Sequence, residues 1–233
     1  ASGASFPLIS DDIIIDANSF NAPLNINVVS ACKSFICSNY TGTISILNNF
    51  TISGNVGNIT LSAGMTITGP ASFIKTTGGL VNTITSNGVV FDCDFIFAAP
   101  FGTTTNISGT MQINRNLSFT LNSTLVTTLQ GSTIRVGGNI THNGPVQGTA
   151  TIELFGSTTA TINQIATRYL GNNLIINKGI GTFNQADFYW GTSNRTLTYT
   201  SGIVNHTGIL FVFSTGRLNT SGMTWNTIAP QGT

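Results

Sequence analysis

The sequence predicts an all-β fold, and within that class a right-handed parallel β-helix (β-solenoid) whose coils contain roughly 20 to 25 residues. Residues that favour strands dominate: 37 of the 233 residues are Thr and 27 are Ile, whereas the helix former Glu occurs once, at Glu153. Apolar and polar residues alternate along the chain, and Gly or Asn interrupts the alternation after roughly 8 to 12 residues. Weak internal repetition favours a stack of similar coils over a sandwich or a barrel.

Eight segments show the period-2 alternation of a half-buried strand. In chain order they are residues 43–46, 59–61, 65–68, 111–113, 117–121, 134–136, 152–154 and 197–200. Turn signals separate the strands and predict turns at 54–55, 57–58, 78–79, 87–88, 137–139, 143–144, 171–172 and Gly208. Residues 162–169 carry apolar side chains at helical spacing, so one short helical turn is expected there.

The chain is expected to form a single solenoid domain over residues 1–233. No charged linker and no shift in composition divides it. The longest apolar stretch, residues 95–101, is far shorter than the roughly 18 residues that a membrane-spanning helix needs. The chain starts without Met, which fits the removal of a signal or of upstream sequence from a longer protein.

The charge balance excludes two classes of partner. Eight Lys and Arg residues oppose seven Asp and Glu residues, and the formal net charge is +1. Electrostatic capture of nucleic acid or of an anionic membrane requires clustered basic residues, which this composition does not provide. We therefore expect neither a nucleic-acid partner nor membrane insertion.

Four stretches of the sequence resemble β-solenoid proteins of tailed phages: residues 12–20, 61–69, 197–202 and 218–226. The resemblance covers most of the chain and implies a structural protein of the virion, of the tail fibre, tailspike or capsid-attached spike type. It further implies a homotrimer, other virion proteins as partners, and a location on an extracellular particle. It supplies no set of catalytic residues.

The best candidate for chemistry is the segment 91–97, Phe-Asp-Cys-Asp-Phe-Ile-Phe. Strand alternation directs its Phe and Cys side chains into the core and places Asp92 and Asp94 outside, about 7 Å apart. Two such carboxylates can bind Ca²⁺ with further oxygens, or act as acid and base on a glycosidic bond. We favour two solvated charges that keep an apolar strand soluble, because no third carboxylate, His or aromatic platform accompanies them in the sequence.

A second acidic group, Asp11, Asp12 and Asp16, lies near the start of the chain. We expect these residues to cap or solvate the first coil rather than to bind a metal ion. Glycine pairs such as Gly137–Gly138 are not followed by the Lys-Ser/Thr of a phosphate-binding loop. The sequence therefore predicts no metal site, no cofactor site and no catalytic residues.

The cysteines and histidines do not have the spacing of a metal or catalytic motif. Cys32, Cys37 and Cys93 are expected to be buried free thiols, and a disulfide from Cys32 or Cys37 to Cys93 is the alternative. His142 and His206 each lie beside Asn or Gly and are expected to be exposed turn residues.

The densest aromatic cluster is Phe-Tyr-Trp at residues 188–190. Aromatic rings can stack on sugars or fill a core, and we favour the core or a subunit interface. Tyr189 and Trp190 are kept, together with Asp92 and Asp94, as the candidate ligand contacts.

Taken as a sequence, the chain favours a non-enzymatic virion protein that projects from a phage particle and contacts the host surface, with a host glycan as a further partner. Two alternatives stay open: a tailspike depolymerase that cuts polysaccharide, and a bacterial surface adhesin or ice-binding solenoid. Pairs such as Thr66/Thr68 and Thr83/Thr85 can match an ice lattice, but their irregular spacing does not give one pair in each coil.

Overall fold

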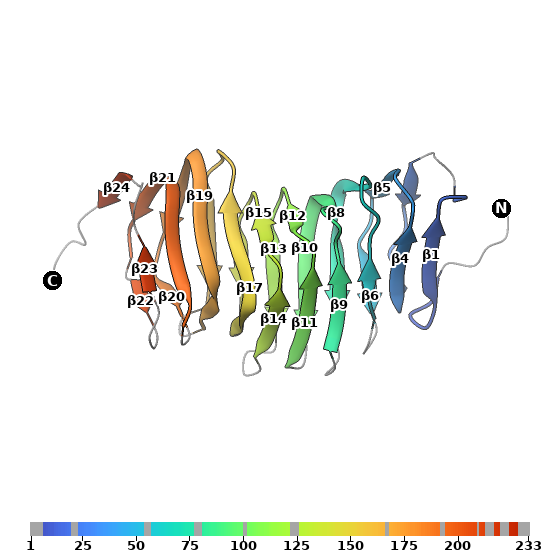
Figure 1. The fold of residues 1–233 in the computed structure, drawn as a ribbon, viewed down its shortest axis with the longest axis horizontal. Coiled ribbons are helices and arrows are strands. Elements are labelled where there is room, and N and C mark those ends of the chain that lie inside the picture. The colour runs from blue at the N-terminus through green and yellow to red at the C-terminus, as the bar shows by residue number, and fades with distance from the viewer. Residues whose placement is uncertain are drawn as a thin grey trace.

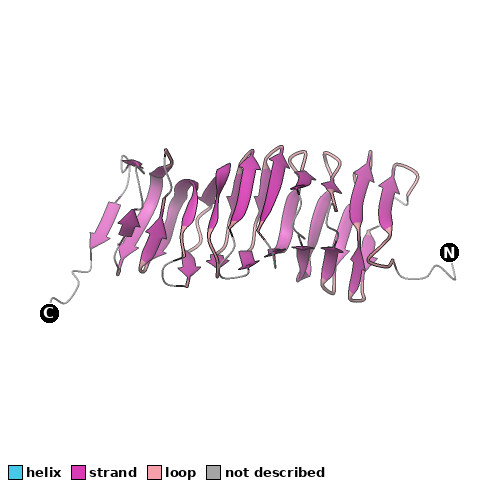
Figure 2. Ribbon diagram, turned by 90° about the horizontal axis from the view of Figure 1, so that it is seen from below, coloured by secondary structure: helices cyan, strands magenta, loops and turns pink. Residues whose placement is uncertain are grey.

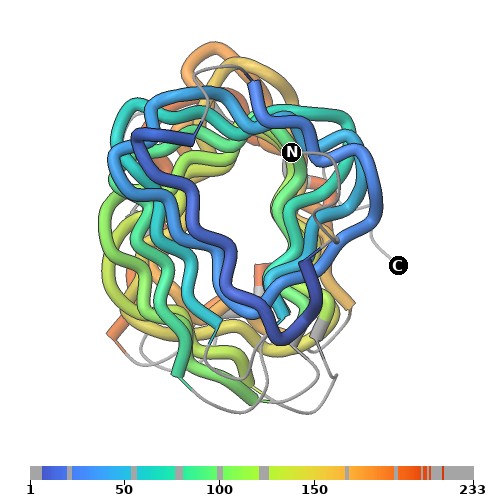
Figure 3. Tube along the Cα trace, turned by 90° about the vertical axis from the view of Figure 1, so that its right-hand side faces the viewer, coloured from blue at the N-terminus to red at the C-terminus, as the bar shows by residue number. Residues whose placement is uncertain are grey.

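The computed structural model describes residues 7–19, 23–53, 57–76, 81–99, 102–121, 126–165, 168–191, 194–208, 210–212, 217–219 and 224–227. Within these ranges every regular element is a β-strand, and no helix occurs (Figure 2). The strands form an elongated rod with β1 near one end and β24 near the other (Figure 1). Viewed along the rod, successive coils superimpose around one axis (Figure 3). The predicted β-solenoid is confirmed.

Each coil supplies strands to three faces of the rod, and all paired strands are parallel. Face 1 contains β1 (Asp12–Asp16), β4 (Ser34–Ser38), β7 (Ile59–Thr60), β9 (Val81–Thr85), β11 (Thr103–Ser108), β14 (Thr127–Gly131), β20 (Phe188–Trp190) and β22 (Leu210–Val212). Face 2 contains β2 (Leu24–Ile26), β5 (Thr43–Ile46), β12 (Met111–Ile113), β15 (Ile134–Val136) and β23 (Arg217–Asn219). Face 3 contains β3 (Ser30–Cys32), β6 (Phe50–Ser53), β13 (Leu117–Leu121), β16 (Ile140–His142), β18 (Ala160–Gln164) and β24 (Thr224–Thr227).

Five longer strands bend around a corner and belong to more than one face. The strands β8 (Thr66–Thr76), β10 (Val90–Ala99) and β21 (Thr196–His206) pair first in face 2 and then in face 3. β17 (Val146–Phe155) pairs in faces 1 and 2, and β19 (Leu170–Gln185) pairs in all three. Where a strand continues from one face to the next, no loop is inserted at the corner, and the coil contains fewer residues.

The coil length agrees with the prediction except at one point. Thr43 and Thr66, hydrogen-bonded across neighbouring coils, are 23 residues apart, within the predicted range. Arg135 and Glu153 are also paired across neighbouring coils but are only 18 residues apart. This coil is short mainly at the turn from face 3 into face 1, where 6 positions separate Ile140 from Val146, whereas 10 separate their partners Leu117 and Thr127 in the coil before. β17 then turns from face 1 into face 2 at Gly148 without a loop.

Gly148 is required at this corner, and its replacement is the first testable prediction. Its φ is +130°, and a Cβ atom on it would lie 1.9 Å from the Leu129 carbonyl oxygen of the coil below. Gly148→Ala should therefore lower the free energy of unfolding by about 2–3 kcal/mol, measured by chemical denaturation.

Gly88→Ala is the matched control. Gly88 also has a positive φ, +78°, but nothing lies within 4 Å of its added Cβ. Only the backbone strain of roughly 1 kcal/mol is expected there. Equal losses in the two variants would contradict the steric explanation for Gly148.

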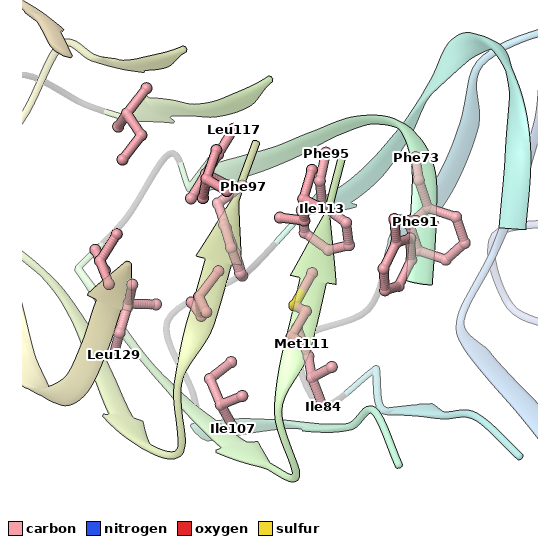
Figure 4. Packing of buried hydrophobic residues seen from close by; sticks show 14 of the residues in the cluster. Phe73, Ile84, Phe91, Phe95, Phe97, Ile107, Met111, Ile113, Leu117 and Leu129 are labelled. Carbon is pink, nitrogen blue, oxygen red and sulfur yellow. The ribbon is translucent and has the colours of Figure 1, made fainter. Parts of the chain in front are cut away.

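The core runs along the rod from Ile15 to Val204 and consists of inward side chains of all three faces. Because the coils stack in register, like side chains lie above one another: Phe50, Phe73 and Phe95 form one such column on face 3. The ring of Phe73 lies 5.5 Å from the ring of Phe50 and 5.5 Å from that of Phe95, centroid to centroid. The column continues from Phe95 to Leu117, and Phe97, two residues after Phe95 in the same strand, lies beside Leu117 (Figure 4). Burial of these rings is the main source of stability.

Two local predictions are wrong. Ile162 lies inside β18, which ends at Gln164, and Ile165 is exposed after it, so the described part of 162–169 contains a strand and no helix, and residues 166–167 lie outside the described residues. The turn predicted at 171–172 lies within β19, where the buried Asn172 donates to the Ala150 carbonyl oxygen at 3.0 Å. The turns predicted at 54–55 and 78–79 lie outside the described residues. No helix in the described ranges is long and apolar enough to span a membrane.

Candidate functional site

Asp92 and Asp94 lie outside the core, as alternation predicts, but on two different faces. Asp92 pairs with Thr68 in face 2, and Asp94 pairs with Ser72 in face 3. The bend between them is at Cys93, which is fully buried. Asp92 therefore ends the part of β10 in face 2 and Asp94 begins the part in face 3, so the two carboxylates do not share the outer side of one flat strand.

Asp94 is the first member of a hydrogen-bonded ladder at the corner between faces 2 and 3. Its Oδ1 accepts from the backbone N–H of Asn116 at 3.1 Å and from the Asn116 Nδ2 at 3.2 Å. Asn116 Oδ1 then accepts from the N–H of Asn139 at 2.9 Å, and Asn139 Oδ1 accepts from the N–H of Thr161 at 2.9 Å. Each side chain thus satisfies a backbone donor of the next coil, which stabilises the stack.

Asp94 also forms an ion pair with Arg115, with 3.5 Å between Oδ1 and Nε. The Arg115 Nη1 donates to the Gly69 carbonyl oxygen at 3.0 Å, so the guanidinium connects three coils. These contacts give Asp94 a structural role at the corner. Asp92 is exposed and lies outside the ladder.

Two of the three acidic residues of the first coil, Asp11 and Asp16, cap turns as expected, and Asp12 forms an ion pair with Lys33 at 3.6 Å. Asp16 Oδ1 accepts from the N–H groups of Asn18 at 3.0 Å and Ser19 at 2.9 Å. The Ser19 hydroxyl and these N–H groups lower the pKa of Asp16. Asp11 accepts from the Leu8 N–H at 2.8 Å. Across the described ranges no group of three or more potential ligands is placed to hold a metal ion.

All three cysteines are buried and free, which confirms the favoured prediction. Cys32 and Cys37 both point inward although five residues separate them, because the chain turns between β3 and β4 at Lys33. Burial raises the pKa of each thiol, including Cys93, to about 12. These thiols are poor nucleophiles at neutral pH.

The prediction that His142 is exposed is wrong. His142 is buried in β16, where its Nδ1 lies 3.1 Å from the Gly144 carbonyl oxygen, which can only accept. Burial lowers its pKa, with the Gly144 carbonyl and the Gln164 amide opposing that shift. His206 lies in β21 rather than in a turn.

The aromatic cluster divides between core and surface. Phe188 and Trp190 are buried, and the Trp190 indole N–H donates to the Asn172 carbonyl oxygen at 3.0 Å. Trp190 is therefore a core residue that a ligand on the outside of the rod does not reach. Tyr189, between these two anchors, points outward and is half-buried.

Tyr189 lines an open groove of about 470 Å³ where face 3 turns into face 1. Its walls come from three successive coils and include Asn163, Ala186 and Thr207, with Gln164 and Asp187 beside them. The register explains this row: Thr161 pairs with Asn184, and Asn184 pairs with Asn205, so the residues two positions later also stack.

Hydrogen bonds within the wall hold the groove in shape. Gln164 Nε2 donates to the Asp187 carbonyl oxygen of the next coil at 3.2 Å. Below Gln164, at the paired position of β16, lies the buried His142. Asn163 and Gln164 lie in β18 and Tyr189 lies in β20, whereas Ala186, Asp187, Thr207 and Gly208 lie in the short segments that join strands at this corner.

Sequence reasoning singled out Tyr189 but missed Asn163, Asp187 and Thr207. Their polar, exposed character is common to much of this chain and carries no motif. The signal that was present is their spacing of about one coil, which becomes informative only when the register is known. No protein-family model, curated protein or solved structure matches the chain.

Proposed function

We propose that this chain is a non-enzymatic structural protein of a phage particle, a tail fibre, spike or capsid-attached rod that projects from the virion and contacts the host surface. The observation that carries the proposal is the role of Asp94. The carboxylate that the sequence offered for glycan cleavage is committed to the ladder with Asn116 and to Arg115. Polar groups on this surface hold coils together, as a load-transmitting rod requires.

Further contacts between coils support a rigid rod. Arg135 Nε donates to Glu153 Oε2 at 2.9 Å, and Glu153 Oε1 accepts from Asn177 Nδ2 at 2.9 Å in the next coil. The Arg135 guanidinium also lies 4.4 Å from the ring centre of Phe155. Six of the chain's fifteen charged residues form ion pairs between neighbouring coils, which favours a structural role.

Assembly into a homotrimer, and contact with other virion proteins, are part of this proposal. Apolar side chains are exposed on the first coils, among them Ile14 (66% exposed) and Val29 (77% exposed). Such surface is commonly covered by association. The low net charge of +1 offers little electrostatic repulsion between copies.

The ice-binding alternative is less well supported by the geometry. An ice-binding surface needs its threonines in one plane, but Thr66 and Thr68 lie in face 2 and Thr83 and Thr85 lie in face 1. The depolymerase alternative depends on Asp92 and Asp94. The following experiment distinguishes it from the non-enzymatic function.

The test is digestion of a panel of candidate host polysaccharides by the wild-type chain and by an Asp92→Asn/Asp94→Asn double variant. We expect no release of oligosaccharides by either protein, because Asp94 is a structural acceptor. Turnover by wild type that falls by orders of magnitude in the double variant would identify a depolymerase. Immunogold electron microscopy should place the chain on projecting parts of phage particles, and labelling confined to a cell envelope would contradict the virion assignment.

A further inference from the structure

The groove around Tyr189 has the size and chemistry of a ligand site. Its volume of about 470 Å³ falls within the roughly 300–1,000 Å³ of typical small-molecule sites. It crosses three coils, and since neighbouring strands are about 4.8 Å apart, it extends roughly 10 Å along the rod axis. A groove of that length accommodates two sugar units of an extended chain.

The groups that line the groove suit a ligand rich in hydroxyls. Asn163 offers both a donor and an acceptor, Thr207 a hydroxyl, and Asp187 carboxylate oxygens that only accept. Tyr189 adds a half-exposed aromatic ring, whose face can pack against the C–H groups of a pyranose. Ala186, small and exposed at the centre of the row, leaves room above it.

Charge narrows the class of ligand. None of the eight described residues that line the groove is basic, and Asp187 contributes the one acidic side chain among them. An anionic polymer would bring its charges beside this carboxylate, and none of the described lining residues is a basic residue that could attract them, which disfavours binding. Neutral hydroxyls have no such cost and can donate to the carboxylate.

The groove is also preorganised for binding a ligand. Tyr189 is positioned by the buried side chains of Phe188 and Trp190 on either side, and Trp190 is anchored through its indole N–H to Asn172. The Gln164 amide bonds to the Asp187 backbone across the wall. Binding then costs little ordering of the protein.

We propose that this groove binds a neutral, hydroxyl-rich polysaccharide, with one sugar ring stacked on Tyr189 and its hydroxyls bonded to Asn163, Asp187 and Thr207. The inference rests on the surface-contact function proposed above and names its ligand class. It assigns no cleavage of the polysaccharide.

The test measures binding of the whole chain to an array of neutral glycans, followed by titration with the neutral polymer that binds best and with polygalacturonate and heparin as anionic polymers. We expect binding to neutral glycans and at least about tenfold weaker binding to both anionic polymers. Tyr189→Ala should weaken neutral binding at least about tenfold, whereas Tyr189→Phe, which keeps the ring, should change it less than about threefold.

Two further variants separate loss of the site from loss of the fold. Ala186→Trp fills the groove without removing a contact group and should weaken binding at least about tenfold. Asn106→Ala, on the outer side of β11 and away from the groove, should bind as wild type does. All variants are checked for wild-type circular dichroism and melting.

The proposal is overturned if no neutral glycan binds, if the anionic polymers bind as well as neutral ones, or if Tyr189→Ala and Ala186→Trp bind normally. Such results leave the rod function intact, since that function is judged by labelling on particles. Conversely, groove-dependent glycan binding by a chain found only in a cell envelope would overturn the virion assignment and keep the groove.

Discussion

Replacing Phe73 by Ala is expected to lower the free energy of unfolding by about 3–5 kcal/mol. Phe73 is fully buried, and its ring is the centre of the aromatic column in the first half of the rod. It lies 6.0 Å from Phe35, 5.4 Å from Phe91 and 5.5 Å from both Phe50 and Phe95. The coils above and below are joined through strands, so they cannot close on the cavity that the missing ring leaves.

Phe155→Ala is the matched control for this prediction. Phe155 is half-exposed on the outer side of β17, where its ring contacts the Arg135 guanidinium. Its removal should cost about 1 kcal/mol. Denaturant titration of both variants checks the comparison, and a loss at Phe73 no larger than at Phe155 would show that the aromatic column does not stabilise the fold.

Lys75→Met is expected to raise the free energy of unfolding at pH 7 by about 2–3 kcal/mol. Lys75 is fully buried on face 3 between Ile52 and Phe97, and its Nζ donates to the Thr76 carbonyl oxygen. Burial lowers the pKa of Lys75 from 10.5 to about 8. At pH 7 the folded protein therefore keeps a desolvated charge in its core, and methionine fills the same space without that cost.

The gain should depend on pH in a defined direction. The folded pKa is lower than the unfolded one, so between pH 8 and 10.5 the unfolded chain binds the proton and the folded chain does not. Wild-type stability arising from Lys75 rises with pH across this window. The advantage of Lys75→Met should thus be constant below pH 8, shrink between 8 and 10.5, and be lost above it.

The difference between the two proteins is the quantity to measure, because other groups titrate in the same range. Burial raises the pKa of Cys32, Cys37 and Cys93 from 9.0 to about 12, so ionisation of the unfolded chain above pH 9 lowers the stability of both proteins. Lys33→Met is the control: Lys33 is 44% exposed and pairs with Asp12 at 3.6 Å. Its effect should stay within about 0.5 kcal/mol at every pH. A destabilised Lys75→Met protein at pH 7 would contradict the argument.

The alternation of the sequence predicted eight strand segments, and each of them overlaps a strand of the structure. Residues 111–113, 117–121 and 134–136 were predicted as strands and are β12, β13 and β15 with the same bounds. Successive side chains of a strand point to opposite sides, so the sequence of one strand indicates which residues face inward even when the neighbouring strands are unknown. The same rule would have placed His142 inside, two residues after the buried Ile140; its position before Asn-Gly suggested a turn instead.

Only the tertiary structure decided where the chain bends and what the bends bring together. The corner at Cys93 separates Asp92 from Asp94, and it follows from the register with β8, which belongs to the neighbouring coil. The groove is a second case, since Asn163 and Thr207 meet beside Tyr189 through the stacking of three coils. Local sequence sets which side of a strand faces inward, whereas contacts between coils depend on pairing over some twenty residues, a long-range choice that no single coil contains.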